Sequence, residues 1–193
     1  MAETPSTMLP LGTPVPAFQL VDSVSDRQVT EKDVDGSRAL LVMFICNHCP
    51  FVKHVVGELG RLGEDYLSRG VGIVAINSND VRLYPQDGPQ RMKELAEREG
   101  WGFPFLLDDT QEVAKAFRAA CTPDFFLFGG DGRLAYRGQL DDSRPGNGRP
   151  VTGSDLRAAL DAVLEGRPIP EPQVPSVGCN IKWKPGNAPN YYG

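Results

Sequence analysis

The sequence has few features that would place the chain outside ordinary globular proteins. Of its 193 residues, 40% are hydrophobic and 23% are charged. No apolar run approaches the ~20 residues that a membrane-spanning helix needs. The first residues also lack the basic start and apolar stretch of a signal peptide. We therefore expect a single domain in a soluble, cytoplasmic protein, with a core that needs no disulfide or metal to hold it.

Positive charge is in deficit. The chain has 20 Lys and Arg against 25 Asp and Glu, which gives a net charge of −5. Nucleic acids and anionic membrane surfaces attract proteins of the opposite sign. We expect neither as a partner.

Cysteine is scarce as well. The chain has four, Cys46, Cys49, Cys121 and Cys179. In a reducing cytosol this number does not indicate a structural disulfide framework. The spacing of Cys46 and Cys49, with two residues between them, indicates chemistry instead.

Hydrophobic periodicity and turn signals predict alternating strands and helices. The expected strands are 18–21, 28–30, 39–45, 71–76, 103–107, 125–128 and 134–139, and the expected helices are 50–69, 89–99, 110–119 and 154–164. Thr110 and Ser154 are the expected N-caps of the last two helices. This order predicts an α/β layer fold whose sheet is mainly parallel with an antiparallel edge.

Two segments differ in composition. Residues 1–165 are expected to form the domain, with residues 1–13 loosely ordered. Residues 166–193 contain six prolines but also large apolar side chains such as Ile181 and Trp183. We expect this tail to lie as an extended strap on the surface of the domain.

The motif Cys46-Asn47-His48-Cys49 lies between a buried strand and a helix that starts near Pro50, a residue tolerated in a first helical turn. A thiol attacks only as the thiolate, and the positive end of a helix lowers its pKa. A protonated His48 would hold the Cys46 thiolate by charge attraction. We predict Cys46 as the nucleophile and Cys49 as the thiol that resolves the mixed disulfide or sulfenic acid.

Two other interpretations of this motif remain open. Cys46, Cys49 and a histidine, His48 or His54, are ligand types that suit a soft metal such as Cu(I). A structural zinc site normally takes four ligands, commonly in two pairs, and a second pair is missing here. Alternatively, the two cysteines are buried and redox-inert. The prediction for the chain is no metal and no cofactor.

Several segments together resemble one family, the peroxiredoxin-like branch of the thioredoxin superfamily, which includes alkyl hydroperoxide reductase and thiol-specific antioxidant proteins. The segments are Gly12 to Phe18, ICNHCPFVKH, IVAINSND, FPFLLDDTQEVAKAF, CTPDFFLF and GCNIKWK, and they span about residue 10 to 185. The resemblance implies a thioredoxin-like fold, a central mixed sheet flanked by helices, with an N-terminal β-hairpin extension. It also implies a disulfide or peroxide as substrate, protein or small molecule, and a dithiol electron donor. The oligomeric state is left open.

The same resemblance assigns a role to Thr122 and Pro123. In the family this position holds a cis-proline loop that faces the nucleophilic sulfur and pairs with an extended substrate backbone. Thr122 would supply those hydrogen bonds. An ordinary turn proline is the alternative.

The sequence departs from the family at two points. Disulfide-reducing thioredoxins carry a buried aspartate six residues before the first cysteine, where this chain has Leu40. Typical peroxiredoxins carry Pro and Thr or Ser before the peroxide-reactive cysteine, and aligned on Cys49 these positions are Val42 and Cys46. Neither departure changes the expected redox chemistry, but both leave the substrate open.

Four further groups of residues are weaker candidates. Cys121 lies two residues before Pro123, and Cys179 could resolve an oxidised cysteine, as a tail cysteine does in some peroxiredoxins. A small buried residue is the alternative for each. The segment 141–144 could border the site, but a solvated loop is the favoured interpretation. Residues 77–80 end a strand at the carboxyl edge of the sheet, where sites gather in α/β folds, but turn formation is the favoured interpretation.

Overall fold

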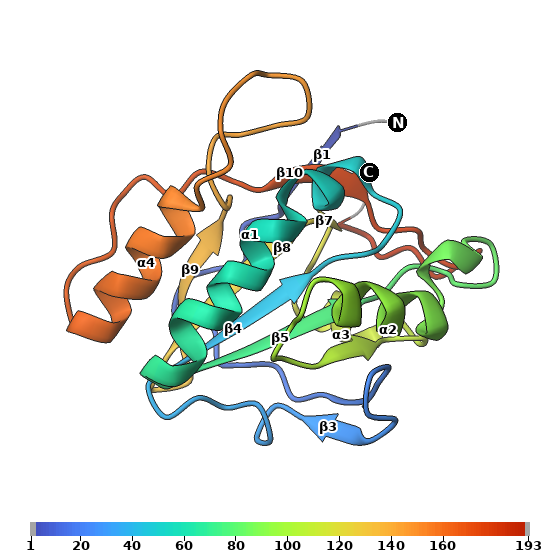
Figure 1. Cartoon of the computed structure of the whole chain (residues 1–193), viewed down its shortest axis with the longest axis horizontal. Coiled ribbons are helices and arrows are strands. Elements are labelled where there is room, and N and C mark those ends of the chain that lie inside the picture. The colour runs from blue at the N-terminus through green and yellow to red at the C-terminus, as the bar shows by residue number, and fades with distance from the viewer. Residues whose placement is uncertain (1–2, 192–193) are drawn as a thin grey trace.

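The computed structural model of the chain describes residues 3–191 and contains a seven-stranded sheet with helices packed on it (Figure 1). The strands of this sheet are β2 (Gln19–Asp22), β3 (Gln28–Thr30), β4 (Ala39–Phe44), β5 (Val71–Asn77), β6 (Phe105–Leu107), β8 (Asp124–Gly129) and β9 (Leu134–Gly138). The helices are α1 (Pro50–Tyr66), η1 (Leu67–Arg69), η2 (Pro85–Asp87), α2 (Pro89–Arg98), α3 (Glu112–Ala116) and α4 (Ser154–Glu165). None of the helices in the described part of the chain is long and apolar enough to cross a membrane.

The strand order is β3-β2-β6-β5-β4-β8-β9, and the sheet is mixed. Only β4 with β5 and β5 with β6 pair in parallel, while the other neighbours pair antiparallel. The expectation of a mainly parallel sheet is therefore wrong. A parallel pair needs a long crossover connection, and only α1 and α2 connect neighbouring strands of this sheet in that way.

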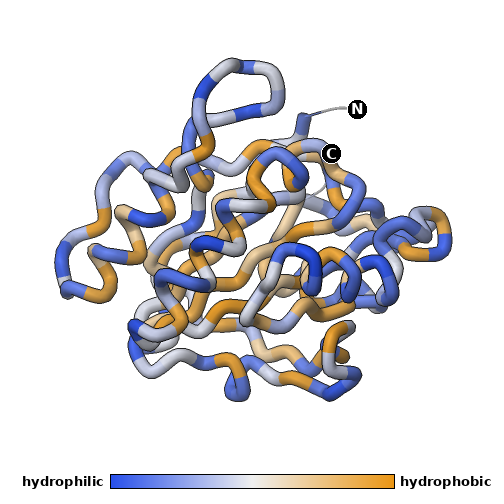
Figure 2. Tube along the Cα trace, viewed as in Figure 1, coloured by the Kyte–Doolittle hydropathy of each residue, from blue (hydrophilic) through white to orange (hydrophobic). Residues whose placement is uncertain are grey.

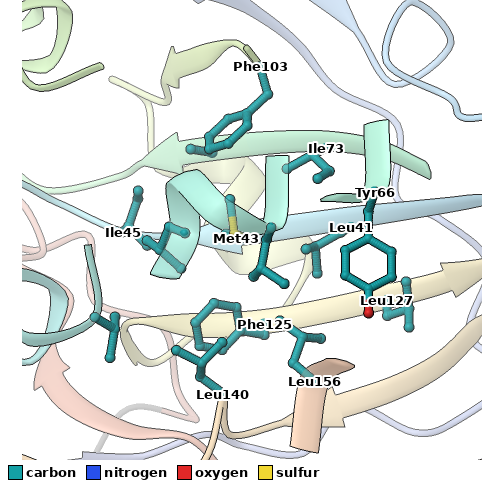
Figure 3. Packing of buried hydrophobic residues seen from close by; sticks show 14 of the residues in the cluster. Leu41, Met43, Ile45, Tyr66, Ile73, Phe103, Phe125, Leu127, Leu140 and Leu156 are labelled. Carbon is teal, nitrogen blue, oxygen red and sulfur yellow. The ribbon is translucent and has the colours of Figure 1, made fainter. Parts of the chain in front are cut away.

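The core lies on both faces of β4, whose six residues are all buried. Leu41 and Met43 contact one hydrophobic cluster, with α1, α2 and α4, and Leu40 and Val42 contact a second cluster with α3. Figure 3 shows side chains of the first cluster converging between α1 and the sheet. In Figure 2 the central strands are mostly hydrophobic and the outer turns hydrophilic. A strand buried on both faces explains the unbroken apolar run in the sequence.

A second, three-stranded sheet joins the two ends of the chain. Its order is β1 (Glu3–Pro5), β10 (Val177–Asn180) and β7 (Cys121–Thr122), all antiparallel. Strands β1 and β10, from opposite ends of the described residues, thus lie side by side (Figure 1). The tail is thus a strand between two others and not only a surface strap. Residues 3–5, part of the segment expected to be loosely ordered, pair with it, while residues 1–2 and 192–193 lie outside the described residues.

Both predicted N-caps are wrong. The cap of α3 is Gln111 and that of α4 is Gly153, and neither helix has a side-chain cap hydrogen bond. Both cap residues have left-handed backbone, with φ of 65° and 66° respectively. The carboxylate of Asp141 instead accepts the N–H groups of Thr152 and Gly153 ahead of α4, both at 2.7 Å. This explains why Asp141 is buried and not part of a solvated loop.

Candidate active site

The Cys46–Cys49 motif connects the end of β4 to the start of α1. Ile45 still donates its N–H to Ile76 O on β5, at 3.0 Å, so the strand positions the first cysteine. Cys49 is the N-cap of α1, and Pro50 occupies the first helical turn. Both sulfurs therefore lie at the positive end of a helix of 17 residues.

The loop before β8 contacts the sulfurs of both Cys46 and Cys49. The Thr122–Pro123 peptide bond is cis. Thr122 Oγ1 lies 3.4 Å from Cys46 Sγ, and the Cys49 thiol donates to Thr122 O at 3.2 Å. The structure thus places Thr122 and Pro123 beside the motif, although their role toward a substrate stays a prediction.

His48 connects Cys46 to a buried carboxylate. Its Nδ1 lies 3.9 Å from Cys46 Sγ and 2.5 Å from Asp87 Oδ2. The ring stacks on Tyr84, with 5.3 Å between the centroids. Because the same nitrogen faces both partners, Asp87 fixes the position of the ring, and a protonated ring there would stabilise a Cys46 thiolate by charge attraction.

Asp87 is the functional residue that the sequence reasoning missed. It lies in η2, is fully buried, and its Oδ1 accepts the backbone N–H groups of Asn47 and His48 at 2.9 and 3.0 Å. Asn79 donates to Oδ2 at 2.9 Å, and Asn77 donates to the Asp87 carbonyl at 2.8 Å. Burial opposes its ionisation, but the hydrogen bonds from His48 and Asn79 hold the pKa of Asp87 below its usual value.

This network also gives a role to Asn77 and Asn79, for which turn formation was the favoured interpretation. Asn77 ends β5 and Asn79 follows it, at the carboxyl edge of the sheet, where sites gather in α/β folds. That position and the run of polar residues after an apolar strand were the available signal. A buried acid therefore contacts the motif, but it is Asp87 in η2. The strand position where thioredoxins carry their buried aspartate is occupied by Leu40.

The two sulfurs share one negative charge. Burial raises the pKa of Cys46, and its hydrogen bond to Cys49 raises it further. The same hydrogen bond outweighs burial at Cys49 and lowers the pKa of that thiol to about 5. The pair therefore loses its first proton easily and holds its second strongly.

A cleft of about 300 Å³ gives access to Cys46. It is lined by Cys46, Asn47, Val52, Lys53, Val56, Leu95 and Arg98, from the motif, α1 and α2. Cys49 is not among the lining residues. Cys46 is itself buried, so it forms part of the wall of the cleft.

The expected metal ligands come together only in part. Cys46, His48 and Asp87 offer ligand atoms that all lie within 4.8 Å of one another. Asp87 thus takes the place of Cys49 in the expected set. His54 lies on α1 and lines a different, small cavity with Phe51 and Pro123 that contains no cysteine.

A family model with the description "AhpC/TSA family" matches residues 11–137, more than half of the chain. The chain belongs to the AhpC/TSA family. The match includes the motif, Asp87 and the cis-proline, but it ends before the tail with Cys179.

Two solved structures resemble this AhpC/TSA family member over nearly its whole length. One is an uncharacterized conserved protein from Geobacillus kaustophilus, 59% identical, with a TM-score of 0.94 and coverage of 96% of this chain and 98% of that chain. The other is a hypothetical protein from Sinorhizobium meliloti 1021, 49% identical, with a TM-score of 0.92 and coverage of 95% and 100%. Both matches extend beyond the part that the family model covers.

A characterised relative is more distant. The thiol-disulfide oxidoreductase ResA of Geobacillus thermodenitrificans is 25% identical over 131 residues, which are 68% of this chain and 70% of ResA. A thioredoxin domain of a thiol-disulfide oxidoreductase from Bacteroides vulgatus and a C-terminal domain of a putative one from Bacteroides thetaiotaomicron match with less than 25% identity and show the thioredoxin-like fold alone. The fold and the family expected from the sequence are thus confirmed.

The two remaining cysteines lie on paired strands, Cys121 on β7 and Cys179 on β10. Both are buried, and no disulfide joins any of the four cysteines, which all lie in the described part of this AhpC/TSA family chain. Cys121 donates to Pro123 O at 3.6 Å. A redox role for either of them stays a prediction.

Proposed function

We propose that the protein is a thiol-disulfide oxidoreductase in which Cys46 is the nucleophile and Cys49 the resolving thiol. The observation that carries this proposal is the set of groups around the Cys46 sulfur. The Thr122 hydroxyl can donate to a thiolate there. The His48 ring, whose Nδ1 is hydrogen-bonded to Asp87, lies 3.9 Å from the sulfur, where a protonated ring attracts the charge of a thiolate. The Thr122 carbonyl beside Cys49 can only accept, so it draws the proton that the pair keeps to Cys49 and leaves the charge on Cys46. This acts against the hydrogen bond between the two thiols, which lowers the pKa of Cys49.

The reaction follows from these contacts. The Cys46 thiolate attacks one sulfur of a substrate disulfide, and the other sulfur leaves as a thiolate and takes up a proton. Cys49 then attacks Cys46, the substrate's remaining sulfur leaves as a thiol, and a Cys46–Cys49 disulfide forms. A dithiol donor returns this disulfide to two thiols. Such a cycle suits a reducing compartment such as the cytoplasm.

Disulfides are favoured over peroxides as substrates. The positions that carry Pro and Thr or Ser in typical peroxiredoxins are Val42, buried under α3, and Cys46 itself. A thiol-dependent antioxidant activity on peroxides would have to rely on His48 and Thr122 instead. Measuring the turnover of a disulfide and of a peroxide separately distinguishes the two activities.

The test is turnover of hydroxyethyl disulfide, and separately of hydrogen peroxide, with dithiothreitol as donor. We expect the wild-type chain to reduce the disulfide and Cys46→Ser to lose this activity completely. Cys121→Ser, a change of another buried cysteine, should keep it. Wild-type protein that turns over neither substrate would contradict the proposal.

The metal-binding alternative is tested by adding Cu(I) to the reduced chain. A metal at Cys46, His48 and Asp87 must displace the hydrogen bond between His48 and Asp87. This favours the redox function. Tight stoichiometric binding that is lost in Cys46→Ser, together with absence of turnover, would favour the carrier.

A further inference from the structure

Strand register places Cys179 on the same side of the small sheet as the active cysteines. In the antiparallel pair of β10 and β7, Cys179 lies opposite Thr122, and Asn180 lies opposite Cys121. Directly opposed residues on paired strands share a face. The Thr122 hydroxyl is 3.4 Å from Cys46 Sγ, so its face is the one that meets the motif. Cys179 therefore points toward the cysteine pair, and Cys121 points to the other face.

The contacts agree with this placement. Cys46, Cys49 and Cys179 belong to one buried cluster, which does not include Cys121. The Cys49 sulfur reaches the Thr122 carbonyl at 3.2 Å, and it also shares a hydrogen bond with the Cys179 thiol. Cys49 thus has a cysteine partner on either side.

The tail is fixed in this position. An added Cβ at Gly178 would lie 2.1 Å from Thr122 O, so only glycine permits this close approach. Ser176 donates its hydroxyl to Gly138 O at 2.6 Å, and Ile181 N–H donates to Ala120 O at 3.0 Å. Both ends of β10 are therefore held, and Cys179 stays at the motif.

We propose that Cys179 is a third redox cysteine, which converts the Cys46–Cys49 disulfide into a Cys49–Cys179 disulfide and regenerates the Cys46 thiol. The proposal rests on the proposed function, because the Cys46–Cys49 disulfide is the product of substrate reduction. The Cys179 sulfur attacks Cys49 Sγ, the Cys46–Cys49 bond breaks, and its electron pair remains on Cys46. The proton of Cys179 ends on Cys46, so no further oxidant or reductant takes part.

The negative charge of the reduced Cys46–Cys49 pair keeps Cys179 protonated, so Cys179 can attack only after the pair is oxidised. Burial raises the pKa of Cys179 to about 12, and its hydrogen bond with Cys49 contributes to the rise. Formation of the Cys46–Cys49 disulfide removes the negative charge from the pair. The Cys179 thiol then ionises more easily, while the reduced pair keeps it protonated.

The exchange changes what the oxidised chain can do. Cys49 normally releases a substrate held on Cys46, but a Cys49 bonded to Cys179 cannot attack. The oxidised chain then keeps a Cys46 thiol at the cleft that captures a substrate as a stable mixed disulfide. Reduction of Cys49–Cys179 by the dithiol donor frees Cys49 and releases that substrate.

The test is disulfide mapping in Cys46→Ser, where Cys49 has lost its usual partner. The chain is oxidised with diamide, remaining thiols are alkylated, and peptides are identified by mass spectrometry without reduction. We expect a Cys49–Cys179 peptide and loss of alkylation at both cysteines. The matched control, Cys46→Ser with Cys121→Ser, should give the same peptide.

The contradicting result is alkylation of Cys49 and Cys179 in oxidised Cys46→Ser, or a Cys49–Cys121 peptide. Wild-type chain provides a second measurement that needs no substitution. After oxidation, chains with a Cys49–Cys179 disulfide and an alkylated Cys46 are expected, and Cys179→Ser should yield only Cys46–Cys49. If wild-type protein reduces disulfides but never forms Cys49–Cys179, this inference fails and the proposed function stands.

Discussion

At the scale of single residues, the two histidines of the chain have very different surroundings. His48 lies between the Cys46 sulfur and the Asp87 carboxylate, whereas His54 lines a cavity without a cysteine. Only the first lies where the charge of a protonated ring can act on the sulfur. The sequence pattern indicated His48 through its place in the motif. It could not indicate Asp87, which lies 39 residues from His48 and meets it only through the fold.

His48→Phe tests the role of this contact. Phenylalanine keeps a ring that can stack on Tyr84 but offers no nitrogen to Cys46 or Asp87. We expect disulfide reduction to slow by about 10- to 100-fold, because a ring that can carry positive charge beside the thiolate is lost. We also expect the free energy of unfolding to fall by about 1–3 kcal/mol, since a buried carboxylate loses a partner.

The matched control for this variant is His54→Phe, which should keep wild-type turnover. Steady-state rates with hydroxyethyl disulfide, together with urea unfolding of both variants, make the comparison. A His48→Phe chain that is folded and turns over at the wild-type rate would rule out a role for the imidazole.

At the scale of elements, local signals predicted some segments well and others not at all. The apolar run of β4 and the helical spacing of α1 lie within the sequence itself, and both elements begin where expected. Strand β10 could not be found in this way, because its partners β1 and β7 are far away in the chain. Its sequence, VGCN, has no alternation, and the surrounding prolines indicate a tail.

Gly178→Ala tests how closely β10 must approach β7. The added methyl group would lie within 2.6 Å of two Thr122 atoms, so the strand has to move away. We expect the free energy of unfolding to fall by about 1–3 kcal/mol, as in other overpacked sites. We also expect less Cys49–Cys179 disulfide after oxidation.

Gly57 provides the control, because a side chain there has room. An added Cβ at Gly57 in α1 would meet only Arg61 Nη1, at 3.9 Å. Gly57→Ala should therefore stabilise the chain by about 0.5–1 kcal/mol through helix propensity. Urea unfolding of the two variants should give changes of opposite sign, and changes of the same sign would refute this description of the tail.

At the scale of the whole molecule, one buried carboxyl should make stability depend on pH. Burial raises the pKa of Asp124 from the usual 3.8 to about 7, and its Oδ1 has no hydrogen-bond partner. Between pH 4 and 7 the folded chain thus keeps a proton that the unfolded chain has released. Its contribution to stability is present in full below the unfolded pKa and is lost as the pH rises.

Asp124→Asn removes this dependence. Relative to the variant, the wild-type chain should lose stability as the pH rises from 4 to 7, by up to about 1.4 kcal/mol per pH unit. The difference between the two chains is the quantity to measure, by urea unfolding at several pH values. Other carboxylates, such as Asp87, make the same contribution to the pH dependence of stability in both chains. Parallel stability curves for the two chains would show that Asp124 is ionised throughout.

The central claim for the molecule is that Cys46 is the attacking sulfur of a cysteine pair that shares one negative charge. The most direct measurement is alkylation of the reduced chain by iodoacetamide across pH, with the modified cysteine identified by mass spectrometry. We expect Cys46 to react first, with a rate that reaches half its maximum well below the ordinary thiol pKa of about 8.5. The rate should follow the first proton loss of the pair, and Cys121 should stay unmodified. Cys46 that reacts no faster than Cys121, or only above pH 8.5, would contradict the account.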